Sequence, residues 1–426
     1  MNRNYPKILI IGQAFHSNSG GGITLSNLFK DWPKERIANL VDFIPFSNDD
    51  YNDINTFELA CYKKIFRVFT VNKFKKNSKK QVSETTSDIN SINNKIKKNV
   101  LKILSFTGLS HIIYSYTLKK DFWEWIRLFN PDIVYTQLSS RDSIKLAEQI
   151  HQKLNKKLAI HIMDDWPSTI GSDSMFSRFW NKKINFEFKE LLDKASIFLS
   201  ISEGMAIEYE KRYNKKFNAF HNPIDIYDWF DLKLNPKDSK ITRILHAGRI
   251  GLGISSSLLT VVKVLQDIKD DGAEVELIFQ SSNIDTDFRN KISKYSIVKI
   301  NNPVDYSEIP KILKNSDILL LSNDFDSLGK DFLKYSMPTK ASEYMISKVP
   351  ILVFSDKNSE VARSAVRHGW AFVVDQNNEV ILKNAIIRLI KEKKLREKLS
   401  KKSFQYAMDH FDSKKVREDF RKILCS

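Results

Sequence analysis

Cysteine is nearly absent from this chain of 426 residues, and so are long apolar runs. The two cysteines, Cys61 and Cys425, provide neither a disulfide framework nor a metal-ligand spacing, which indicates a reducing, cytoplasmic setting. No apolar run approaches the roughly 20 residues that a membrane-spanning helix needs. The N-terminal stretch MNRNYPKILIIG lacks the pattern of a signal peptide, and its apolar part, Ile8–Ile11, is better explained as a first buried strand.

The overall composition is that of a folded protein with well-filled cores. Hydrophobic residues make up 42% of the chain and aromatic residues 12%, which excludes a disordered chain. The length exceeds what one hydrophobic core ordinarily serves, so two domains of roughly 200 residues are expected.

The positive charge is concentrated in one segment. The chain carries a net charge of +17, and Cys61–Lys120 holds fourteen Lys and Arg against Glu84 and Asp88, or +12. Lysines there alternate with apolar residues, as in KIKKNVLKILSF, a pattern that suits an anionic membrane surface. A solvated, lysine-rich insertion is an equally simple interpretation. Nucleic acid is not expected as a partner, because the segment contains no recognisable binding module.

Short apolar runs recur along both halves of the sequence, and most are followed by a helical pattern. These runs lie at 7–12, 131–137, 157–163, 196–202, 241–248, 275–280, 317–322, 350–355 and 370–375. Near-continuous apolar strands that alternate with helices indicate parallel sheets covered on both faces. The sequence therefore predicts an α/β protein with two Rossmann-like, doubly wound domains that face a central cleft.

The predicted domain boundary follows HNPIDIYDWF, near residues 234–240, where the apolar pattern stops before a new strand begins. The resulting parts are an N-terminal domain (1–230) with a basic polar insertion (61–120), a C-terminal domain (231–405), and a C-terminal helix (406–426) expected to pack back across the junction. Residues 75–96 are polar and are predicted to form a mobile loop.

Two strand ends lead into glycine-containing turns. Gly20-Gly21-Gly22 precedes a helical pattern, where backbone amides at a helix N-terminus can approach a phosphate closely. A flexible strand-to-helix turn is the alternative. In the second half, Arg249 follows a strand that ends at Gly248, and a residue there faces the crevice where doubly wound domains bind ligands. Its guanidinium matches a diphosphate, although a surface salt bridge explains it equally well.

The stretch FLKYSMPTKASEYMISKVPILVF places charged residues just ahead of a predicted strand. A helix that begins near Pro338 or Thr339 would put Lys340 and Glu343 on one face, three residues apart. A carboxylate accepts two hydrogen bonds from a vicinal diol such as that of a ribose, and an ammonium attracts phosphate. The alternative is an intrahelical Lys–Glu pair at the surface.

A second polar group follows a strand in HIMDDWPSTIG. Asp164 and Asp165 stand beside Trp166, and carboxylates beside an aromatic face are typical of a sugar site. An aspartate helix cap before Pro167 is the alternative. His161 lies mid-strand and is interpreted first as a packed core residue and second as a ligand contact. Ser202 and Glu203 stand at another strand end.

Taken in order, these segments resemble bacterial glycosyltransferase family 4. The resemblance extends over nearly the whole chain and rests on GGGITLSNL, MDDWP, SISEGM, HNPID, HAGRI, EIPKILKNSDILLLS, PTKASEYMISKVPILVF and HFDSKKVREDF. It implies the two-Rossmann GT-B architecture and transfer of a sugar from a nucleotide-diphosphate sugar, with uridine expected, to a saccharide or lipid-linked acceptor. It also implies retention of the anomeric configuration, no metal and no cofactor.

The resemblance assigns donor-binding roles by position. Glu343 matches the family glutamate that binds the donor ribose, Arg249 matches the arginine at the diphosphate, and Gly21 and Gly22 match the loop near the same phosphates. Two departures stand out. Many members carry a second glutamate where this chain has Tyr335, and the lysine often found after the Gly-Arg motif is missing. We expect Lys340 to supply the lost positive charge.

The remaining predicted roles complete the candidate site. Asp164 and Asp165 are the candidates for catalysis, Ser202 is a further donor contact, and Trp166 and His161 are the expected acceptor contacts. The enzyme is expected in the cytoplasm, docked at the inner face of the membrane. Two alternatives stay open, a nucleotide-sugar epimerase or hydrolase of the same fold and a catalytically degenerate partner subunit.

Overall fold

The computed structural model describes most of the chain, in two compact units that are treated separately. The described residues are 5–15, 19–42, 54–59, 63–65, 69–70, 106, 111, 114–170, 174–230, 240–281 and 284–426. Unit 1 comprises Met1–Ala14, Trp32–His161 and Trp166–Phe198, and unit 2 comprises Phe15–Asp31, Ile162–Asp165 and Leu199–Ser426. The predicted loop at 75–96, almost all of the predicted boundary and most of the basic insertion lie outside the described residues.

The first sheet has seven strands in the order β10-β9-β8-β7-β1-β2-β3, and each registered pair is parallel. Its strands are β1 (Ile8–Ile11), β2 (Ile37–Val41), β3 (Asn55–Glu58), β7 (Ile133–Gln137), β8 (Lys157–Ile162), β9 (Ile197–Ser200) and β10 (Asn218–Ala219). Four of them confirm predicted apolar runs. Three were not predicted: Asn39 interrupts the apolar run of β2, β3 contains only one strongly apolar residue, and β10 is two residues long.

A small antiparallel sheet frames the basic insertion. Its strands are β4 (Lys63–Ile65), β5 (Phe69–Thr70) and β6 (Tyr114–Tyr116), in the order β5-β4-β6. Lys63 pairs with Tyr116 and Ile65 with Tyr114, so the two ends of the predicted insertion are hydrogen-bonded to each other.

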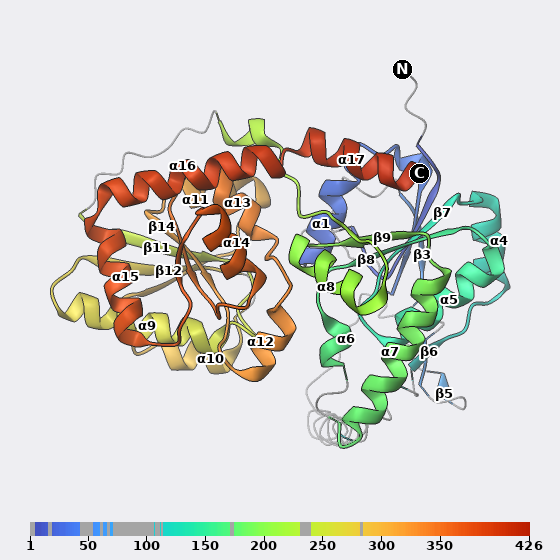
Figure 1. Ribbon diagram of the computed structural model, residues 1–426, viewed down its shortest axis with the longest axis horizontal. Helices are drawn as coiled ribbons and strands as arrows, with labels where there is room; N and C mark the ends of the chain where they lie inside the picture. The colour runs from blue at the N-terminus through green and yellow to red at the C-terminus, as the bar shows by residue number, and fades with distance from the viewer. Residues whose placement is uncertain are drawn as a thin grey trace, which may run out of the picture. The chain divides into compact units, whose positions relative to one another are not determined.

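The second sheet is a doubly wound Rossmann sheet in the order β13-β12-β11-β14-β15-β16 (Figure 1). Its strands are β11 (Thr242–Ala247), β12 (Val275–Gln280), β13 (Val298–Asn301), β14 (Ile318–Ser322), β15 (Ile351–Phe354) and β16 (Phe372–Val374). Successive residues of β11 face opposite sides, Ile244 toward one apolar core and Leu245 toward the other. This burial on both faces explains why the strand sequences are continuously apolar, and the predicted α/β, doubly wound class is confirmed.

Helices accompany both sheets, and they cover both faces of the second, as expected for this class. The helices that accompany the first sheet are α1 (Gly20–Leu28), α4 (Lys120–Phe129), α5 (Arg141–Leu154), α6 (Trp166–Thr169), α7 (Ser177–Lys194) and α8 (Glu203–Tyr213). The later ones are α9 (Ser255–Asp270), α10 (Thr286–Ile292), α11 (Ile309–Lys314), α12 (Ser327–Leu333), α13 (Lys340–Ile346), α14 (Glu360–His368) and α15 (Glu379–Lys391). Short 3-10 helices are η1 (Lys34–Arg36), η3 (Ile226–Trp229) and η4 (Tyr306–Glu308).

The chain ends in two consecutive helices of unit 2, α16 (Lys393–His410) and α17 (Ser413–Cys425). The break between them lies where the sequence has Phe411-Asp412, and Asp412 caps α17 by accepting a hydrogen bond from the Lys414 amide. Phe420 of α17 packs edge to face on Phe29, which follows α1, with ring centroids 5.1 Å apart. Among the described residues, no helix is long and apolar enough to span a lipid bilayer.

Candidate functional site

The glycine run forms the first turn of α1 rather than a loop ahead of it. Ser19 caps the helix by accepting a hydrogen bond from the Gly22 amide at 3.0 Å. Within the described structure, the amides of Gly20 and Gly21 have no acceptor. A Cβ atom at Gly20 would lie 2.8 Å from the Thr339 hydroxyl oxygen, so only glycine fits where this turn packs against the start of α13.

The ammonium of Lys340 lies at the carboxyl end of β11. It donates hydrogen bonds to the carbonyl of Ala247 at 2.7 Å and to Nε2 of His246 at 3.1 Å. Nδ1 of His246 lies 3.3 Å from the Leu320 carbonyl and donates to it, which leaves Nε2 as an acceptor. Burial, reinforced by the nearby Arg249, lowers the pKa of Lys340 to about 7.

Glu343 is a buried carboxylate on the same helix, one turn further on. Its side chain accepts a hydrogen bond of 2.5 Å from the Tyr306 hydroxyl, which η4 supplies after β13. Burial raises the pKa of Glu343 to about 7, although Tyr306 and Lys340 both favour the ionised form. Lys340 and Glu343 form no ion pair in the described structure, so they are not the surface pair that their spacing also allowed.

The charge of Arg249 acts on both Lys340 and Asp164. Its guanidinium is exposed in the loop after β11 and donates to the Leu252 carbonyl at 3.2 Å. Asp164 accepts a hydrogen bond of 3.0 Å from the Ser336 hydroxyl, just before α13. Burial raises the pKa of Asp164, and the charge of Arg249 partly opposes that shift. Arg249 thus acts electrostatically on both Asp164 and Lys340, and all three lie in unit 2.

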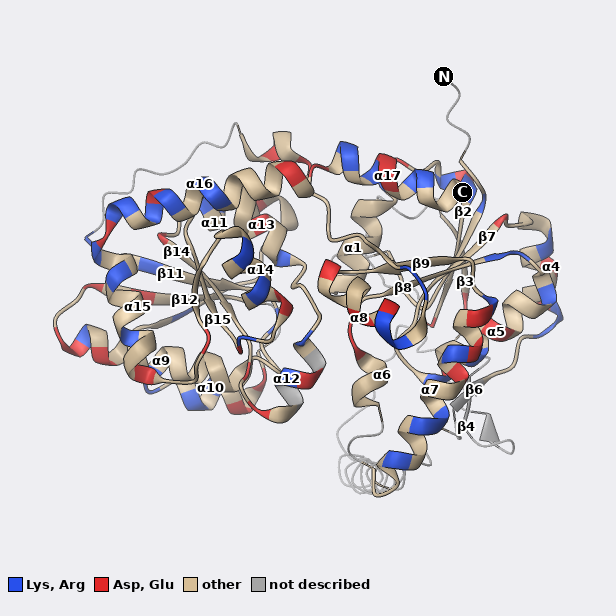
Figure 2. Ribbon diagram, in the orientation of Figure 1, with Lys and Arg blue, Asp and Glu red and all other residues tan. Residues whose placement is uncertain are grey.

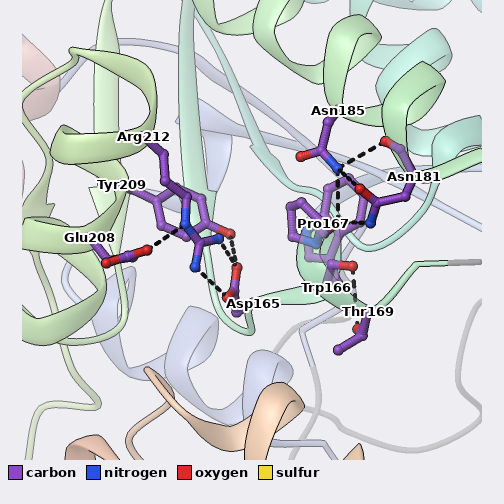
Figure 3. Close-up of polar contacts among 9 residues, drawn as sticks. All are labelled: Asp165, Trp166, Pro167, Thr169, Asn181, Asn185, Glu208, Tyr209 and Arg212. Atoms are coloured by element: carbon purple, nitrogen blue, oxygen red, sulfur yellow. Dashed lines mark hydrogen bonds and ion pairs between the residues drawn. The ribbon is translucent and has the colours of Figure 1, made fainter. Parts of the chain in front are cut away.

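Asp165 is adjacent to Asp164 in sequence but lies among different partners, the side chains of Tyr209 and Arg212, which Figure 3 shows around Asp165. The Asp165 carboxylate accepts hydrogen bonds from two nitrogens of Arg212, at 2.8 and 3.0 Å, and from the Tyr209 hydroxyl at 2.9 Å. Arg212 also donates to Glu208 at 2.7 Å, one turn earlier on α8. Asp165 is therefore a buried acid neutralised within unit 2, a geometry that suits a structural role rather than the predicted catalytic one.

The Ser202 hydroxyl is hydrogen-bonded to the main chain of Tyr335 rather than open to a ligand. The Ser202 hydroxyl caps α8 by accepting from the Met205 amide, and it donates its own hydrogen to the Tyr335 carbonyl at 2.6 Å. The Tyr335 ring lies under the guanidinium groups of Arg212 and Arg363, at 5.3 and 5.7 Å from the ring centre. These contacts explain how tyrosine replaces the expected glutamate: the side chain packs among cations, where it binds α8 to α14.

The two predicted acceptor contacts are buried in unit 1. His161 has no exposed surface, and its Nδ1 lies 2.6 Å from the Tyr135 hydroxyl on the neighbouring strand. The Trp166 ring packs edge to face on Phe188 of α7, with 5.5 Å between ring centroids. Asn181 and Asn185 of α7 hold the turn after Trp166 by donating to the Pro167 carbonyl (Figure 3). Burial argues against direct contact of either ring with a saccharide.

Three polar residues of the candidate site were not singled out from the sequence: Tyr306, His246 and Ser336. Tyr306 follows β13, a strand whose alternating burial gave only a weak apolar signal. His246 lies within the HAGRI motif and immobilises Lys340, and Ser336 holds Asp164. Only their positions could have indicated them. His246 lies at the end of β11, Tyr306 follows β13, and Ser336 precedes α13.

The fold belongs to the GT-B class, with two parallel-sheet α/β domains. A family model described as "Glycosyl transferases group 1" matches residues 241–406, the segment that holds the second sheet. Comparison with curated protein sequences gives no match.

Solved structures resemble the chain over nearly its whole length. HepE of Anabaena, in complex with UDP and glucose, is 12% identical over 99% of this chain and 100% of that chain, with a TM-score of 0.65. Sucrose-phosphate synthase of Thermosynechococcus elongatus is 12% identical over 99% and 98%, with a TM-score of 0.63. A putative UDP-N-acetylglucosamine 2-epimerase of Listeria monocytogenes is 14% identical over 97% and 95%, with a TM-score of 0.55.

Proposed function

We propose that this protein is a glycosyltransferase that moves a sugar from a nucleotide-diphosphate sugar to a saccharide or lipid-linked acceptor. The observation that carries the proposal is the arrangement at the start of α13. There an ammonium with a lowered pKa and a carboxylate with a raised pKa lie one turn apart without pairing. The match of residues 241–406 to group 1 glycosyl transferases supports this reaction, and the motifs HAGRI and PTKASEYM favour family 4.

In this proposal the donor binds to the second sheet's site. Glu343 accepts hydrogen bonds from the ribose diol, and Lys340, Arg249 and the free amides of Gly20 and Gly21 face the diphosphate. Uridine is the proposed base, which the UDP complex of the similar HepE structure supports. Ser202 is left out of the donor contacts because its hydrogen is donated to the Tyr335 carbonyl.

Transfer then consists of one bond broken and one formed at the sugar's anomeric carbon. The bond from that carbon to the diphosphate oxygen breaks, and the positive groups stabilise the leaving diphosphate without a metal. The acceptor hydroxyl oxygen bonds to the same carbon, with retention, and its proton passes to a diphosphate oxygen. Asp164 is the side chain that we place at the acceptor, where it orients the hydroxyl or, in place of the diphosphate oxygen, takes its proton, because its raised pKa suits proton exchange.

A thermal-shift panel of nucleotide diphosphates and their sugars tests donor binding first. A ligand that binds only the folded state stabilises it by about 2.7 kcal/mol at 100 times its dissociation constant, so UDP should raise the melting temperature. Arg249→Gln should weaken that shift. Arg243→Gln is the matched control, because Arg243 lies in the first half of β11, the strand before Arg249, and pairs with Glu276 at 3.0 Å. Equal shifts for wild type and both variants would contradict the placement of the diphosphate.

Acceptor dependence separates transfer from the alternative reaction. The similarity to a putative UDP-N-acetylglucosamine 2-epimerase favours epimerisation or hydrolysis of a nucleotide sugar as the second candidate. A transferase should release UDP much faster when a saccharide acceptor is present, and Asp164→Asn should abolish that release without weakening UDP binding. Release that is independent of every acceptor tried would favour hydrolysis. If no nucleotide diphosphate or nucleotide sugar raises the melting temperature, the protein would instead be a catalytically degenerate partner subunit.

A further inference from the structure

The segment from just before α7 to the middle of that helix exposes aromatic and apolar side chains instead of burying them. Met175, Phe176, Phe179 and Phe186 are each between 52% and 61% exposed. The buried side of the same helix is separate, with Trp180, Ile184 and Phe188 in the core of unit 1. Exposed rings in such a short stretch are unusual for a surface in contact only with water.

Cations lie among these apolar side chains on one face of the helix. Phe179, Lys182, Lys183 and Phe186 follow the spacing i, i+3, i+4, i+7, which places them along one stripe. The Lys183 ammonium lies 6.0 Å from the centre of the Phe179 ring. The stripe thus combines rings with flexible ammonium groups that can extend past them.

The charge of this region is of one sign. Arg178, Lys182, Lys183 and Lys189 are exposed between residues 175 and 189. The single acid of that range, Glu187, forms a bidentate pair with Arg141, at 2.7 Å for both bonds, on the inner side. Figure 2 shows blue and no red on the lower part of α7. Chemically, this combination is complementary to an anionic surface with an apolar layer beneath it.

The backbone joins this face to the lysine-rich segment of the sequence. The Met175 amide donates to the carbonyl of Phe106 at 2.7 Å, and the Phe106 side chain is 56% exposed. Phe106 belongs to the segment Cys61–Lys120, whose net charge is +12. In Figure 1 the N-terminal end of α7 is the part of that helix farthest from the first sheet.

We propose that Met175–Lys189, called the α7 face below, inserts into the surface of an anionic phospholipid bilayer. Phe176 and Phe179 enter the boundary between head groups and acyl chains, and the four cations contact lipid phosphates. A protein partner fits less well, because the cores of protein interfaces are depleted in lysine and a stable one covers about 800 Å² on each side. The inference goes beyond the proposed transfer reaction, and vesicle binding requires no donor.

Co-sedimentation of the full chain with vesicles tests the proposal. The probes are phosphatidylcholine vesicles alone and with phosphatidylglycerol in about a 2:1 ratio, at low and high salt. The wild type should bind the anionic vesicles and lose that binding at high salt. Phe176→Ser with Phe179→Ser should lower the partition coefficient about tenfold or more, since about half of each ring leaves water on insertion. Lys182→Gln with Lys183→Gln should lower it about 25-fold, about fivefold for each cation.

Matched control variants replace exposed residues of the same kinds elsewhere. Val366→Ser with Val380→Ser removes two other exposed apolar side chains, and Lys393→Gln with Lys394→Gln removes two exposed lysines of α16. Both controls should bind vesicles like the wild type, and every variant should keep its melting temperature. Equal binding to neutral and anionic vesicles, or equal losses in the controls, would overturn the proposal. The proposal would also be overturned if the wild type did not bind vesicles and light scattering showed it to be a dimer that only the α7-face variants dissociate.

Discussion

Unit 2 contains two buried clusters, each with one acidic and one basic side chain. The two clusters differ in how those side chains are hydrogen-bonded. In the first, Asp165 accepts from Arg212 and Tyr209, so acid and base neutralise each other directly. In the second, Lys340 donates to a carbonyl and to His246, while Glu343 accepts from Tyr306. The acid and the base of this second cluster have neutral partners and are not bonded to each other.

The difference between the clusters indicates which charges are available to a ligand. A buried ion pair that is fully hydrogen-bonded has little left to offer, and breaking it leaves an unpaired charge in a dry environment. A buried ammonium and carboxylate held apart by neutral partners keep their electrostatic potential, at the expense of stability. Pairs of the second kind are typical of functional sites.

Removing one partner of the first cluster should have the largest effect on stability. Arg212→Met removes the cation that pairs with the buried Asp165 carboxylate, and we expect the free energy of unfolding to fall by about 3 kcal/mol. Urea denaturation followed by circular dichroism measures it. Glu208→Gln is the control, because it removes the charge from the partly exposed i,i+4 pair, which contributes about 0–1 kcal/mol. An unchanged midpoint for Arg212→Met would show that the cluster is not structural.

Neutralising Glu343, the acid of the second cluster, should preserve stability but weaken ligand binding. The raised pKa of Glu343 means that the folded state binds more protons than the unfolded state between about pH 4.5 and 7, so stability falls as pH rises through that window. Glu343→Gln removes this loss and should be at least as stable as the wild type at pH 8. It should also weaken UDP binding about 10- to 100-fold, as expected for losing a charged acceptor. Calorimetric titration measures the affinity, and a destabilised variant with normal affinity would contradict the comparison.

The base of the second cluster predicts the smallest effect, a pH dependence of binding. Lys340 has a pKa of about 7, so it loses its charge as pH rises, whereas Arg249 stays charged. A bound diphosphate favours the charged lysine, and UDP affinity should therefore fall between pH 7 and 9, by at most about tenfold per pH unit. Calorimetry in buffers of different ionisation enthalpy should detect proton uptake on binding.

Lys340→Arg provides the control for that titration, because it keeps a charge at every pH of the series. Its UDP affinity should be flat from pH 7 to 9. The same linkage acts on stability: the unfolded state binds more protons between pH 7 and 10.5, so the wild type gains stability as pH rises there. A wild-type affinity that does not change with pH would exclude Lys340 from the diphosphate site.

The sequence could predict the strands that are buried on both faces, because their apolar runs are continuous. β14 and β15 are of this kind, and each lies within the predicted run. β13 alternates between half-buried and exposed residues, so its strand and the Tyr306 that follows it could not be recognised. The same limit explains why Tyr306 was missed as the partner of Glu343, since the two are 37 residues apart.

The sequence by itself determined the α/β class, the alternation of continuously apolar strands with helices, and the helix that carries Lys340 and Glu343, because local periodicity acts over a few residues. Only the tertiary structure decided which of two adjacent aspartates is neutralised: Arg212 of α8 reaches Asp165, whereas Ser336 reaches Asp164. It also buried His161 and Trp166 and left Phe176 and Phe179 exposed. Side-chain environment depends on elements that are distant in the chain, and no local pattern records which of them come together.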